Sequence, residues 1–413
     1  MAEMTKTKGG FKLVAGDKVL WVILAALAVI SILVIYSSSA KMGYSVSDAR
    51  SVTDLLREQL INVAVCAGAL LLVHRINCRF YGRMAWIIYW GCWLLTLAPY
   101  FKGDTINDAH RWIFGIQPNE ALKIATVILL ARELAARQSI IDRIKLIPTL
   151  NPLKLFRTPA HLKMLREHTL PILFPVVASC AVILPAHTSA ALLVFVISLI
   201  MMYIGRVRRT ELLKILLLAA SLGMLMSAAR LGRSETAGGR VSTWVQTLLE
   251  PRSNVSTGEL TDTERSMIAI YEGGLFGKGA GQSAVRVELT HPECDYTFAF
   301  FVEEYGLFMA LIVMSFYMWI AVRGIVIFTR CETAFPGLLV LGLVMIVALQ
   351  ALLHIFVSVN FFPETGQTLP FISRGGSSML FATIAMAIVI GVSRQNDEKS
   401  HDKPRGESIL ERG

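Results

Sequence analysis

Charge is scarce in this chain of 413 residues, because only 17% of them are Asp, Glu, Lys or Arg while 54% are hydrophobic. Soluble globular domains carry about a quarter charged residues, so this composition excludes an ordinary soluble globule. It is typical of a protein that crosses a membrane several times. The net charge of +10 then indicates basic cytoplasmic loops, and we do not interpret it as nucleic-acid binding.

Paired cysteines and a signal-peptide cleavage site are also missing. The six cysteines show no paired spacing, so neither a disulfide framework nor a dedicated metal site is predicted. The first apolar run begins at Leu20 and is long enough for a full span, with no small-residue cleavage site after it. We therefore expect this run to stay in the protein as an anchor.

Long apolar runs dominate what is present. A helix needs about 20 apolar residues to cross a bilayer core, and about ten segments approach that pattern. They are expected near 20–36, 60–73, 84–101, 121–134, 170–184, 189–205, 215–229, 296–322, 335–360 and 375–393. The predicted fold class is an all-α polytopic membrane protein with about ten transmembrane helices.

Lys and Arg are concentrated in alternate loops, which indicates the orientation of the chain. They gather in the loops near 75–83, 132–168, 206–214 and 323–330 and in the C-terminal tail. An even number of spans then places both termini in the cytoplasm. The predicted domains are a cytoplasmic N-terminal tail, a transmembrane domain and a cytoplasmic C-terminal tail, at 1–19, 20–394 and 395–413.

The longest loop lies at about 230–295, between the seventh and eighth spans, and is extracytoplasmic in this arrangement. Loops of this length are usually functional or disordered. It ends in Asp295, at the mouth of an apolar span that also contains Glu303. An acid in such a place is costly unless it has a use. We interpret Asp295 as a catalytic base at the membrane surface, and Glu303 as a structural or cavity-lining acid.

A second polar constellation, NDAHRWIFGIQPNEALK, covers residues 107–123. Lys123 lies one turn inside a span and needs a partner or a water-filled cavity. Asn119 and Glu120 also fit a plain structural interpretation, in which Asn119 caps the helix and Glu120 lies in its first turn. Arg111 either anchors the chain at the interface or binds a pyrophosphate through forked hydrogen bonds.

Three more external features suit an anion, and each has a structural alternative. Arg240 is either a solvated loop residue or a second anion contact. The turn GGLFGKGAGQ, which contains Lys278, offers backbone N–H groups to an anion or is simply a tight packed turn. The run RGGSS, with Ser377, starts the last helix, whose free N–H groups attract anions, or it is an ordinary helix start with serine caps.

These stretches, in this order, resemble the SEDS family (shape, elongation, division and sporulation), which includes FtsW, RodA and SpoVE, over most of residues 15–395. Four motifs carry the resemblance. They are RWI…QPSE…K, AI..GG..GKG.GQS, a Pro-Glu pair with an Asp ahead of EE.G, and TLPFIS.GGSS, matched at 111–123, 269–283, 292–306 and 368–378. The last motif is closer to the division-type FtsW than to RodA.

The chain departs from the family pattern in three places. The PD.GT element expected after the fifth span reads PAHTS at 185–189, without the acid and the glycine. Arg374 stands where members carry a tyrosine before GGSS, and a Tyr-Gln pair is missing around 261–265. Substrate contacts at these points are expected to differ from the family pattern, whereas Asp295 is unaffected.

The resemblance implies a peptidoglycan glycosyltransferase of the cytoplasmic (inner) membrane, whose active site faces the periplasm or cell exterior. It would polymerise lipid II, a disaccharide-pentapeptide on undecaprenyl pyrophosphate, during cell division, with Asp295 as general base. The implied substrate-binding residues are Arg111, Glu120, Lys123, Arg240, Lys278 and Ser377. A divalent cation, Mg or Mn, is a candidate to assist. The implied partners are a class B penicillin-binding protein transpeptidase, divisome proteins and membrane lipids.

Two other functions compete with this interpretation. A lipid II flippase also needs charged groups along a polar path, which Glu120 and Lys123 would supply. A membrane scaffold would recruit a transpeptidase without any chemistry of its own. Neither function needs a base at Asp295, so glycan polymerisation by an Asp295 variant separates them from an enzyme.

Overall fold

The computed structural model describes residues 14–39, 52–102, 104–106, 109–112, 116–142, 144, 146–147, 163–228, 238–242, 244–245, 260–283 and 295–402. Its long helices are α1 (Lys18–Ser39), α2 (Val52–Val73), α3 (Cys78–Lys102), α4 (Pro118–Ala136), α7 (Leu170–Ile183), α8 (Thr188–Ile204), α9 (Arg209–Ala228), α12 (Thr297–Thr329), α13 (Ala334–Ser358) and α14 (Gly376–Asp402). Each apolar segment expected from the sequence coincides with one of these helices. By length and composition, 7 of the described helices suit a membrane span, and α8 is a shorter apolar helix. The predicted fold class, a helical polytopic membrane protein, is confirmed.

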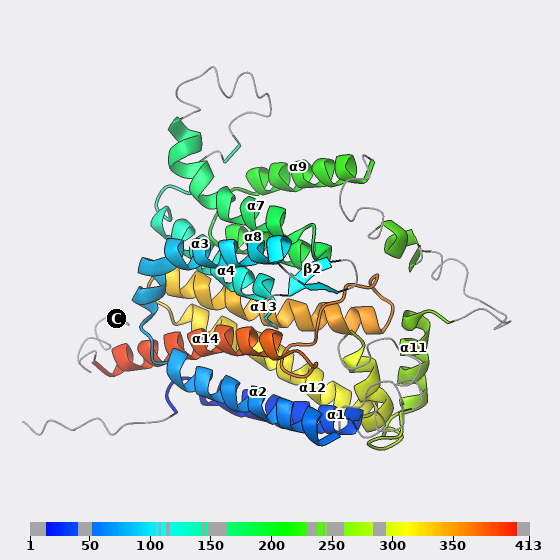
Figure 1. The fold of residues 1–413 in the computed structure, drawn as a ribbon. Helices are drawn as coiled ribbons and strands as arrows, with labels where there is room; N and C mark the ends of the chain where they lie inside the picture. Colours follow the sequence, from blue (N-terminus) through cyan, green and yellow to red (C-terminus); the bar gives the residue numbers. More distant parts are fainter. Residues whose placement is uncertain are drawn as a thin grey trace, which may run out of the picture.

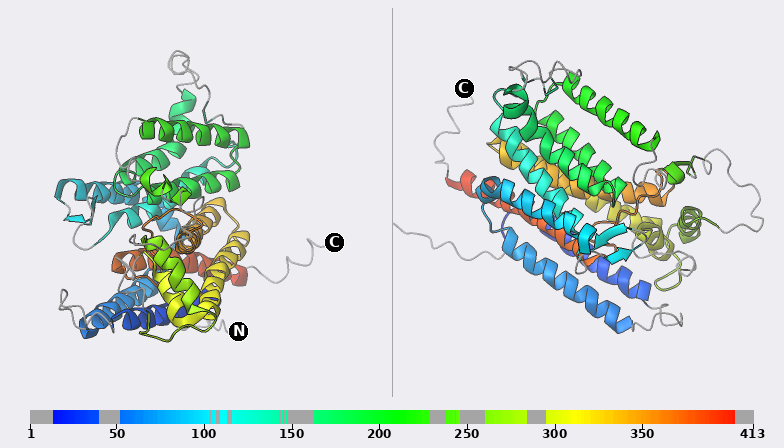
Figure 2. Two further views of the ribbon diagram at one scale, coloured as in Figure 1. Left: turned by 90° about the vertical axis from the view of Figure 1, so that its right-hand side faces the viewer. Right: turned by 45° about the horizontal axis from the view of Figure 1, so that its top comes forward.

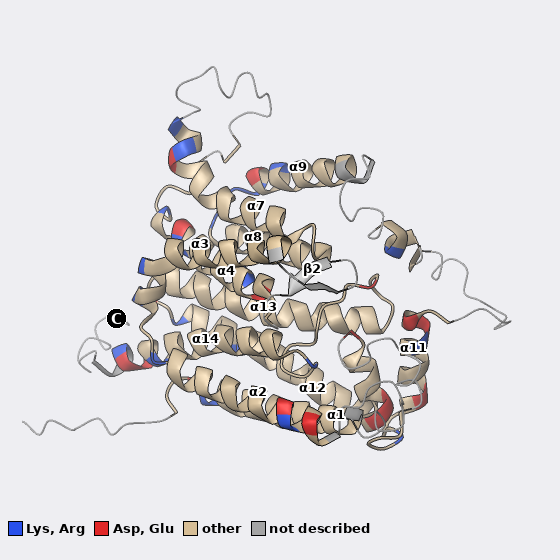
Figure 3. Ribbon diagram, viewed as in Figure 1, with Lys and Arg blue, Asp and Glu red and all other residues tan. Residues whose placement is uncertain are grey.

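The long helices run side by side, and charged residues gather near their ends (Figures 1 and 3). The chain before α1 returns to the last helix, because a Cβ on Gly16 would stand 2.6 Å from the Ile390 carbonyl oxygen of α14. The residues just before α1 and the C-terminal half of α14 therefore lie together at one end of the bundle. The short helix α11 (Asp262–Gly273) lies at the opposite end, which faces the viewer in the left view of Figure 2.

Helix α4 forms the centre of the bundle. It packs against α3, α7, α8 and α13, and nearly all its residues from Pro118 to Leu134 are buried. Since this helix has almost no surface left for water or lipid, its polar side chains must find partners inside the protein. The buried Glu120 and Lys123 accordingly pair with each other inside the bundle.

The segment before α4 forms a small hairpin, which the sequence pattern does not predict. Strands β1 (Asp104–Ile106) and β2 (Ala109–Trp112) pair antiparallel, with an irregularity between Asp104 and Thr105. The backbone of Arg111 lies in β2, whereas its side chain is outside the described part of the structure. Its predicted contact with a pyrophosphate therefore stays a prediction.

Helix α12 is broken at Gly306, where the sequence predicts one continuous span over 296–322. Gly306 has φ 83° and ψ 166°, so a short helical segment from Thr297 to Tyr305 precedes the long one. The glycine-rich turn after α11 fits into this break. Lys278 N–H donates to the Glu303 carbonyl oxygen at 2.9 Å, and Leu307 N–H donates to the Gly274 carbonyl oxygen at 2.9 Å.

Candidate functional site

Asp295 lies in the turn that leads into α12, and its side chain is half-buried. Its Oδ1 lies 4.0 Å from the point where a Cβ on Gly366 would stand. Gly366 has φ +61°, a left-handed conformation that side-chain-bearing residues rarely adopt. The Asp295 carboxylate therefore borders the chain between α13 and α14 at Gly366, a position whose backbone conformation favours glycine.

Tyr296, next to Asp295, ties this turn to the same part of the chain. Its hydroxyl donates to Glu364 Oε1 at 2.6 Å, and Thr263 Oγ1 of α11 donates to the same oxygen at 3.0 Å. Burial, with the Glu364 carboxylate beside it, raises the pKa of Tyr296. The hydroxyl therefore stays a hydrogen-bond donor at physiological pH and holds Glu364 in place.

Residues 364–368, here named the strap segment, are held by side chains rather than by a sheet or helix. Each of its carbonyl oxygens, in order along the chain, accepts a hydrogen bond from another part of the protein. The donors are Arg240 at 3.4 Å, Ser189 at 2.7 Å, His187 at 3.2 Å, His354 at 2.7 Å and Gln350 at 3.1 Å. An extended segment inside a protein must satisfy its polar backbone in some way, and here side chains do so.

His354 connects the strap segment to the start of α12. Its Nδ1 lies 2.7 Å from the Gln367 carbonyl oxygen, and its Nε2 lies 3.3 Å from Phe298 N–H. A carbonyl oxygen only accepts and an amide only donates, so the ring is neutral with its proton on Nδ1. The buried His354 side chain thus joins the start of α12 to the strap segment.

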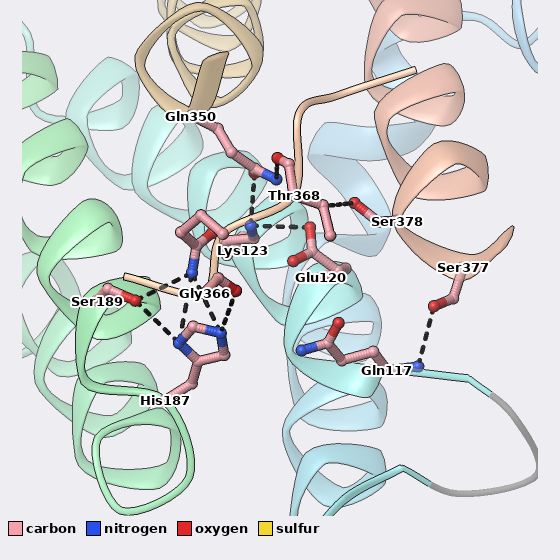
Figure 4. Close-up of polar contacts among 11 residues, drawn as sticks. Gln117, Glu120, Lys123, His187, Ser189, Gln350, Gly366, Thr368, Ser377 and Ser378 are labelled. Carbon is pink, nitrogen blue, oxygen red and sulfur yellow. Dashed lines mark hydrogen bonds and ion pairs between the residues drawn. The ribbon is translucent and has the colours of Figure 1, made fainter. Parts of the chain in front are cut away.

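The buried Glu120–Lys123 pair of α4 supports Thr368, the last residue of the strap segment, through Gln350 (Figure 4). Lys123 Nζ lies 2.8 Å from Glu120 Oε2 and donates to Gln350 Oε1 at 2.8 Å. Gln350 in turn donates to the Thr368 carbonyl oxygen. Lys123 has the partner that its place in a span requires. In this structure the pair supports the segment next to Asp295, while direct contact with a substrate stays a prediction.

Ser377 and Arg374 lie at the start of α14. Ser377 Oγ accepts from Gln117 N–H at 3.3 Å, and the neighbouring Ser378 exchanges a hydrogen bond with Thr368 at 2.9 Å (Figure 4). Arg374 lies 3.5 Å from Glu58 of α2. Arg374 and Ser377 also line a cavity of about 420 Å³ between α2 and α14. The start of α14 thus combines a cation, hydroxyl groups and an open volume.

The glycine-rich turn is occupied by its own packing. Lys278 pairs with Glu272 and lies 3.0 Å from Glu303 Oε1. Its hydrogen bond to Glu272 raises the pKa of its ammonium group, and the neighbouring Glu303 carboxylate raises it further. Glu303 is fully buried and also bonds Ser283. These partners fit the structural interpretation of the turn and of Glu303. Lys278 as a substrate contact stays a prediction.

Asn119 does not cap α4, because the helix already begins at Pro118 and its N-cap residue is Gln117. Glu120 lies in the first turn as predicted. The Asn119 side chain is buried, and within the described residues its Oδ1 has no hydrogen-bond partner. A buried acceptor without a partner is costly, so a hydroxyl group or water bound there would stabilise it.

In the described part of the chain, no three His, Cys, Asp or Glu side chains come together in a group that could hold a metal ion. The Glu364 carboxylate is already bonded by Tyr296 and Thr263. A divalent cation that assists the reaction stays a prediction.

Comparison with known proteins places the chain in a family. A family model described as "Cell cycle protein", FTSW_RODA_SPOVE, matches residues 17–398. The chain belongs to this family. Among the FtsW/RodA/SpoVE relatives, the "Probable peptidoglycan glycosyltransferase FtsW" of Marinobacter nauticus is 26% identical over 386 residues, 91% of this chain and 88% of the relative. "Stage V sporulation protein E" of Bacillus subtilis is 25% identical over 389 residues, 92% and 97% of the two chains.

Solved structures show the same fold. The chain matches one from work on "Structural coordination of polymerization and crosslinking by a peptidoglycan synthase complex" with a TM-score of 0.65 at 18% identity, over 92% of this chain and 98% of that one. The rod shape determining protein RodA of Thermus thermophilus gives a TM-score of 0.57 at 20% identity, with the same coverage. The family membership inferred from the motifs is confirmed.

Proposed function

We propose that this FtsW/RodA/SpoVE member is a peptidoglycan glycosyltransferase that polymerises lipid II at the outer face of the cytoplasmic membrane during cell division. The observation that carries the proposal is the placement of Asp295, which is half-buried at one end of a helical bundle and borders a segment fixed by five side chains. A carboxylate held in a fixed place suits proton abstraction. Relatives named probable peptidoglycan glycosyltransferase FtsW support the same activity.

The proposed reaction joins two lipid-linked sugars. Asp295 takes the proton from the 4-hydroxyl of the GlcNAc unit of one molecule. The resulting oxygen attacks the anomeric carbon of the MurNAc unit on the other molecule, and the bond from that carbon to the pyrophosphate oxygen breaks. The carbon inverts, and undecaprenyl pyrophosphate leaves with the bonding electron pair. General-base assistance of this kind contributes about 10²–10⁴-fold to the rate.

The departing pyrophosphate needs positive charge close by, and electrostatic stabilisation of this type is often the largest contribution to catalysis. Arg240 is exposed beside the strap segment, where its guanidinium bonds only a backbone oxygen among the contacts found in the described residues. Arg111 is assigned the same role through its forked donors. Lys123 is sequestered by Glu120 and Gln350, so we assign it to support the site.

The cavity between α2 and α14 provides a place for a lipid-linked head group. Its polar lining includes Glu58, Asn62 and Arg374, and its apolar lining includes Leu55 and Val65. A guanidinium on the wall of a partly apolar cavity suits a phosphate that carries a lipid chain. In the cell, a class B penicillin-binding protein transpeptidase would crosslink the glycan product, and other divisome proteins would direct both enzymes.

The decisive experiment is lipid II polymerisation in detergent by the purified protein with its cognate transpeptidase. Asp295→Asn keeps the shape of the side chain but removes its basicity, so we expect polymer formation to fall at least about 10²-fold. Asp54→Asn is the matched control, because it makes the same chemical change at an exposed position of α2. The control is expected to polymerise lipid II like the wild type.

Polymer formation by the Asp295→Asn protein at the wild-type rate would remove the catalytic assignment. If no variant and no wild-type preparation makes polymer, while lipid II still crosses a bilayer containing the protein, the flippase function is correct instead. The scaffold function predicts that Asp295→Asn changes neither transpeptidase binding nor any enzymatic rate of the complex.

A further inference from the structure

A second cavity, of about 340 Å³, lies at the end of the bundle opposite Asp295. Its walls come from the end of α4, the end of α8 and the turn between α12 and α13, and they include Gln138, Arg206 and Thr333. Helix α13 runs from this cavity toward the strap segment, and its 25 residues span about 37 Å at 1.5 Å per residue. The cavity is therefore separate from the proposed active site.

Arg206 has a backbone conformation that an arginine rarely adopts. It follows Gly205, the C-cap residue of α8, and its φ of 69° lies in the left-handed region, where helices usually end on glycine. Its side chain is exposed and makes no hydrogen bond or ion pair within the described residues. The nearby Arg209, by contrast, donates to the Tyr203 hydroxyl at 3.3 Å. A guanidinium without a partner of its own thus borders the cavity, at a position where glycine would be less strained.

The start of α13 supplies further hydrogen-bond donors to the same cavity. Thr333 is the N-cap residue, yet its hydroxyl makes no capping hydrogen bond, and Ala334 is the first residue of the helix; both line the cavity. The first N–H groups of a helix have no partner within it, and together with the helix dipole they attract anions. Arg206 and this helix start therefore face one volume with positive charge. The acid on the wall, Glu332, is offset by Lys399 of α14 at 3.8 Å.

Gln138 adds a buried acceptor without a partner. Its Oε1 is shielded from solvent, and within the described residues no group donates a hydrogen bond to it. An unpaired buried acceptor is costly, so its place on a cavity wall points to a donor on a bound molecule. The ionised oxygens of a phosphate diester only accept, so the donor must be another group of that molecule, such as a hydroxyl. The apolar walls at Ile204, Phe328 and Leu338 suit a nonpolar portion of the same molecule.

We propose that this cavity binds the head group of an anionic phospholipid from the cytoplasmic leaflet, a phosphate diester that carries a free hydroxyl group. The phosphate lies between the Arg206 guanidinium, whose fork matches two phosphate oxygens, and the start of α13. The hydroxyl donates to Gln138 Oε1. The walls belong to the basic loops near 132–168, 206–214 and 323–330, which the sequence predicts to be cytoplasmic, where anionic lipids attract basic residues. This site goes beyond the proposed glycosyltransferase function and does not depend on it.

The test measures lipid binding by the full-length protein in phosphatidylcholine nanodiscs, with and without phosphatidylglycerol as a minor component. The wild type is expected to have a higher thermal midpoint with phosphatidylglycerol, because a ligand that binds only the folded state stabilises it. Arg206→Gln removes the charge and the fork and should lose most of that rise. In a native mass spectrometry titration, its apparent Kd for phosphatidylglycerol should be about 10-fold or more weaker. Arg209→Gln is the matched control, because it removes the same charge from the same loop outside the cavity.

Two further variants test the hydroxyl contact and the strained backbone. Phosphatidylmethanol has the charge of phosphatidylglycerol but no head-group hydroxyl, so the wild type should bind it more weakly. Gln138→Leu should abolish this preference while binding of phosphatidylmethanol stays unchanged. Arg206→Gly relieves the left-handed conformation, so in pure phosphatidylcholine it should raise the thermal midpoint, whereas the rise caused by phosphatidylglycerol should be lost. These opposite signs distinguish an arginine that binds a ligand from one that stabilises the loop itself.

Equal losses in Arg206→Gln and Arg209→Gln would overturn the proposal, because they describe a general attraction of anionic lipid to the basic loops. A wild-type midpoint that phosphatidylglycerol does not raise would refute it as well. Glycerophosphoglycerol, the same head group without acyl chains, separates the two sources of this chemistry and should compete with the lipid only weakly. Competition at equal affinity would assign the cavity to a soluble phosphate ester, and the lipid assignment would be wrong. None of these measurements uses glycan polymerisation, so their outcome is distinct from that of the proposed function.

Discussion

At the scale of single residues, the site depends on polar side chains set into apolar helices. Gln350 and His354 lie one turn apart on α13, both almost fully buried, and each bonds a carbonyl oxygen of the strap segment. Burial makes each of these bonds costly to lose, because no water is available to replace it. A few residues therefore fix a segment that has no regular structure of its own.

The Glu120–Lys123 pair gives a residue-scale prediction for stability. Lys123→Met keeps the length and apolar bulk of the side chain but leaves the Glu120 carboxylate buried without its cation. Breaking a buried pair from one side costs about 3–5 kcal/mol, so the thermal midpoint in detergent should fall sharply. The double variant Glu120→Gln with Lys123→Met removes both charges and should recover most of that loss.

The comparison of single and double variants distinguishes an ion pair from a packing effect. Lys399 of α14 and Glu332 also form a pair, but both side chains are about half exposed, at 53% and 50%. Lys399→Met is the control and should cost about 1 kcal/mol or less. If the double variant is as unstable as Lys123→Met alone, the buried charge of Glu120 is not what Lys123 stabilises.

Some of these residues could be predicted from sequence and others could not. Lys123 and Asp295 stand out because a charge in or beside an apolar run needs a reason. His187, Ser189 and His354 give no such signal, since isolated neutral polar residues are common in helices and loops. Their partners lie in the strap segment, up to 179 residues away along the chain, so only the fold reveals them.

At the scale of elements, the glycine-rich turn and the broken helix α12 form one unit. Gly277 and Gly306 both have positive φ, at 79° and 83°. A Cβ on Gly277 would overlap the Glu304 carbonyl oxygen, and one on Gly306 would overlap the Leu275 carbonyl oxygen. The two backbones approach so closely that only glycine fits at either position. This unit holds the short helical segment that follows Asp295.

This element predicts a strong response to a small substitution. Gly277→Ala adds one methyl group where the backbone of α12 already stands and where φ is positive, so it should cost more than about 2 kcal/mol. Gly91→Ala is the matched control, because a Cβ on this glycine of α3 would meet nothing within 4 Å. It should leave the thermal midpoint unchanged or raise it slightly.

A second readout shows whether this unit serves Asp295. Polymer formation by folded Gly277→Ala protein should fall together with its stability, because the turn and the start of α12 share one set of backbone hydrogen bonds. Equal thermal midpoints for the two glycine variants would show that the close approach between turn and helix does not occur.

Helix positions could be predicted well at this scale, whereas the irregular elements could not. The long apolar runs place all ten expected segments, because burial in lipid or core demands a continuous apolar helix. The break at Gly306 lies inside an equally apolar run, and the turn that causes it is about thirty residues earlier in the chain. The hairpin of β1 and β2 lies in a short polar stretch without a strong strand pattern.

At the scale of the whole molecule, the bundle has two chemically different ends. One end carries the start of α1 and the end of α14, where Asp17 pairs with Arg323 of α12. The other end carries α11, the glycine-rich turn, the strap segment and Asp295 (Figure 1). Lipid-linked chemistry at Asp295 requires that this second end faces the cell exterior, while the basic loops favour the cytoplasm for the first.

Cysteine labelling tests this orientation directly. In a variant without native cysteines, Phe276→Cys places a thiol on the glycine-rich turn, where the side chain is 84% exposed. Lys399→Cys places one on the exposed end of α14. A membrane-impermeant maleimide should label Phe276→Cys in intact spheroplasts and should label Lys399→Cys only after lysis. The variant without cysteines gives the background. Labelling of Lys399→Cys in intact cells would place Asp295 on the cytoplasmic side, where the product could not join the cell wall, and the proposed function would then be wrong.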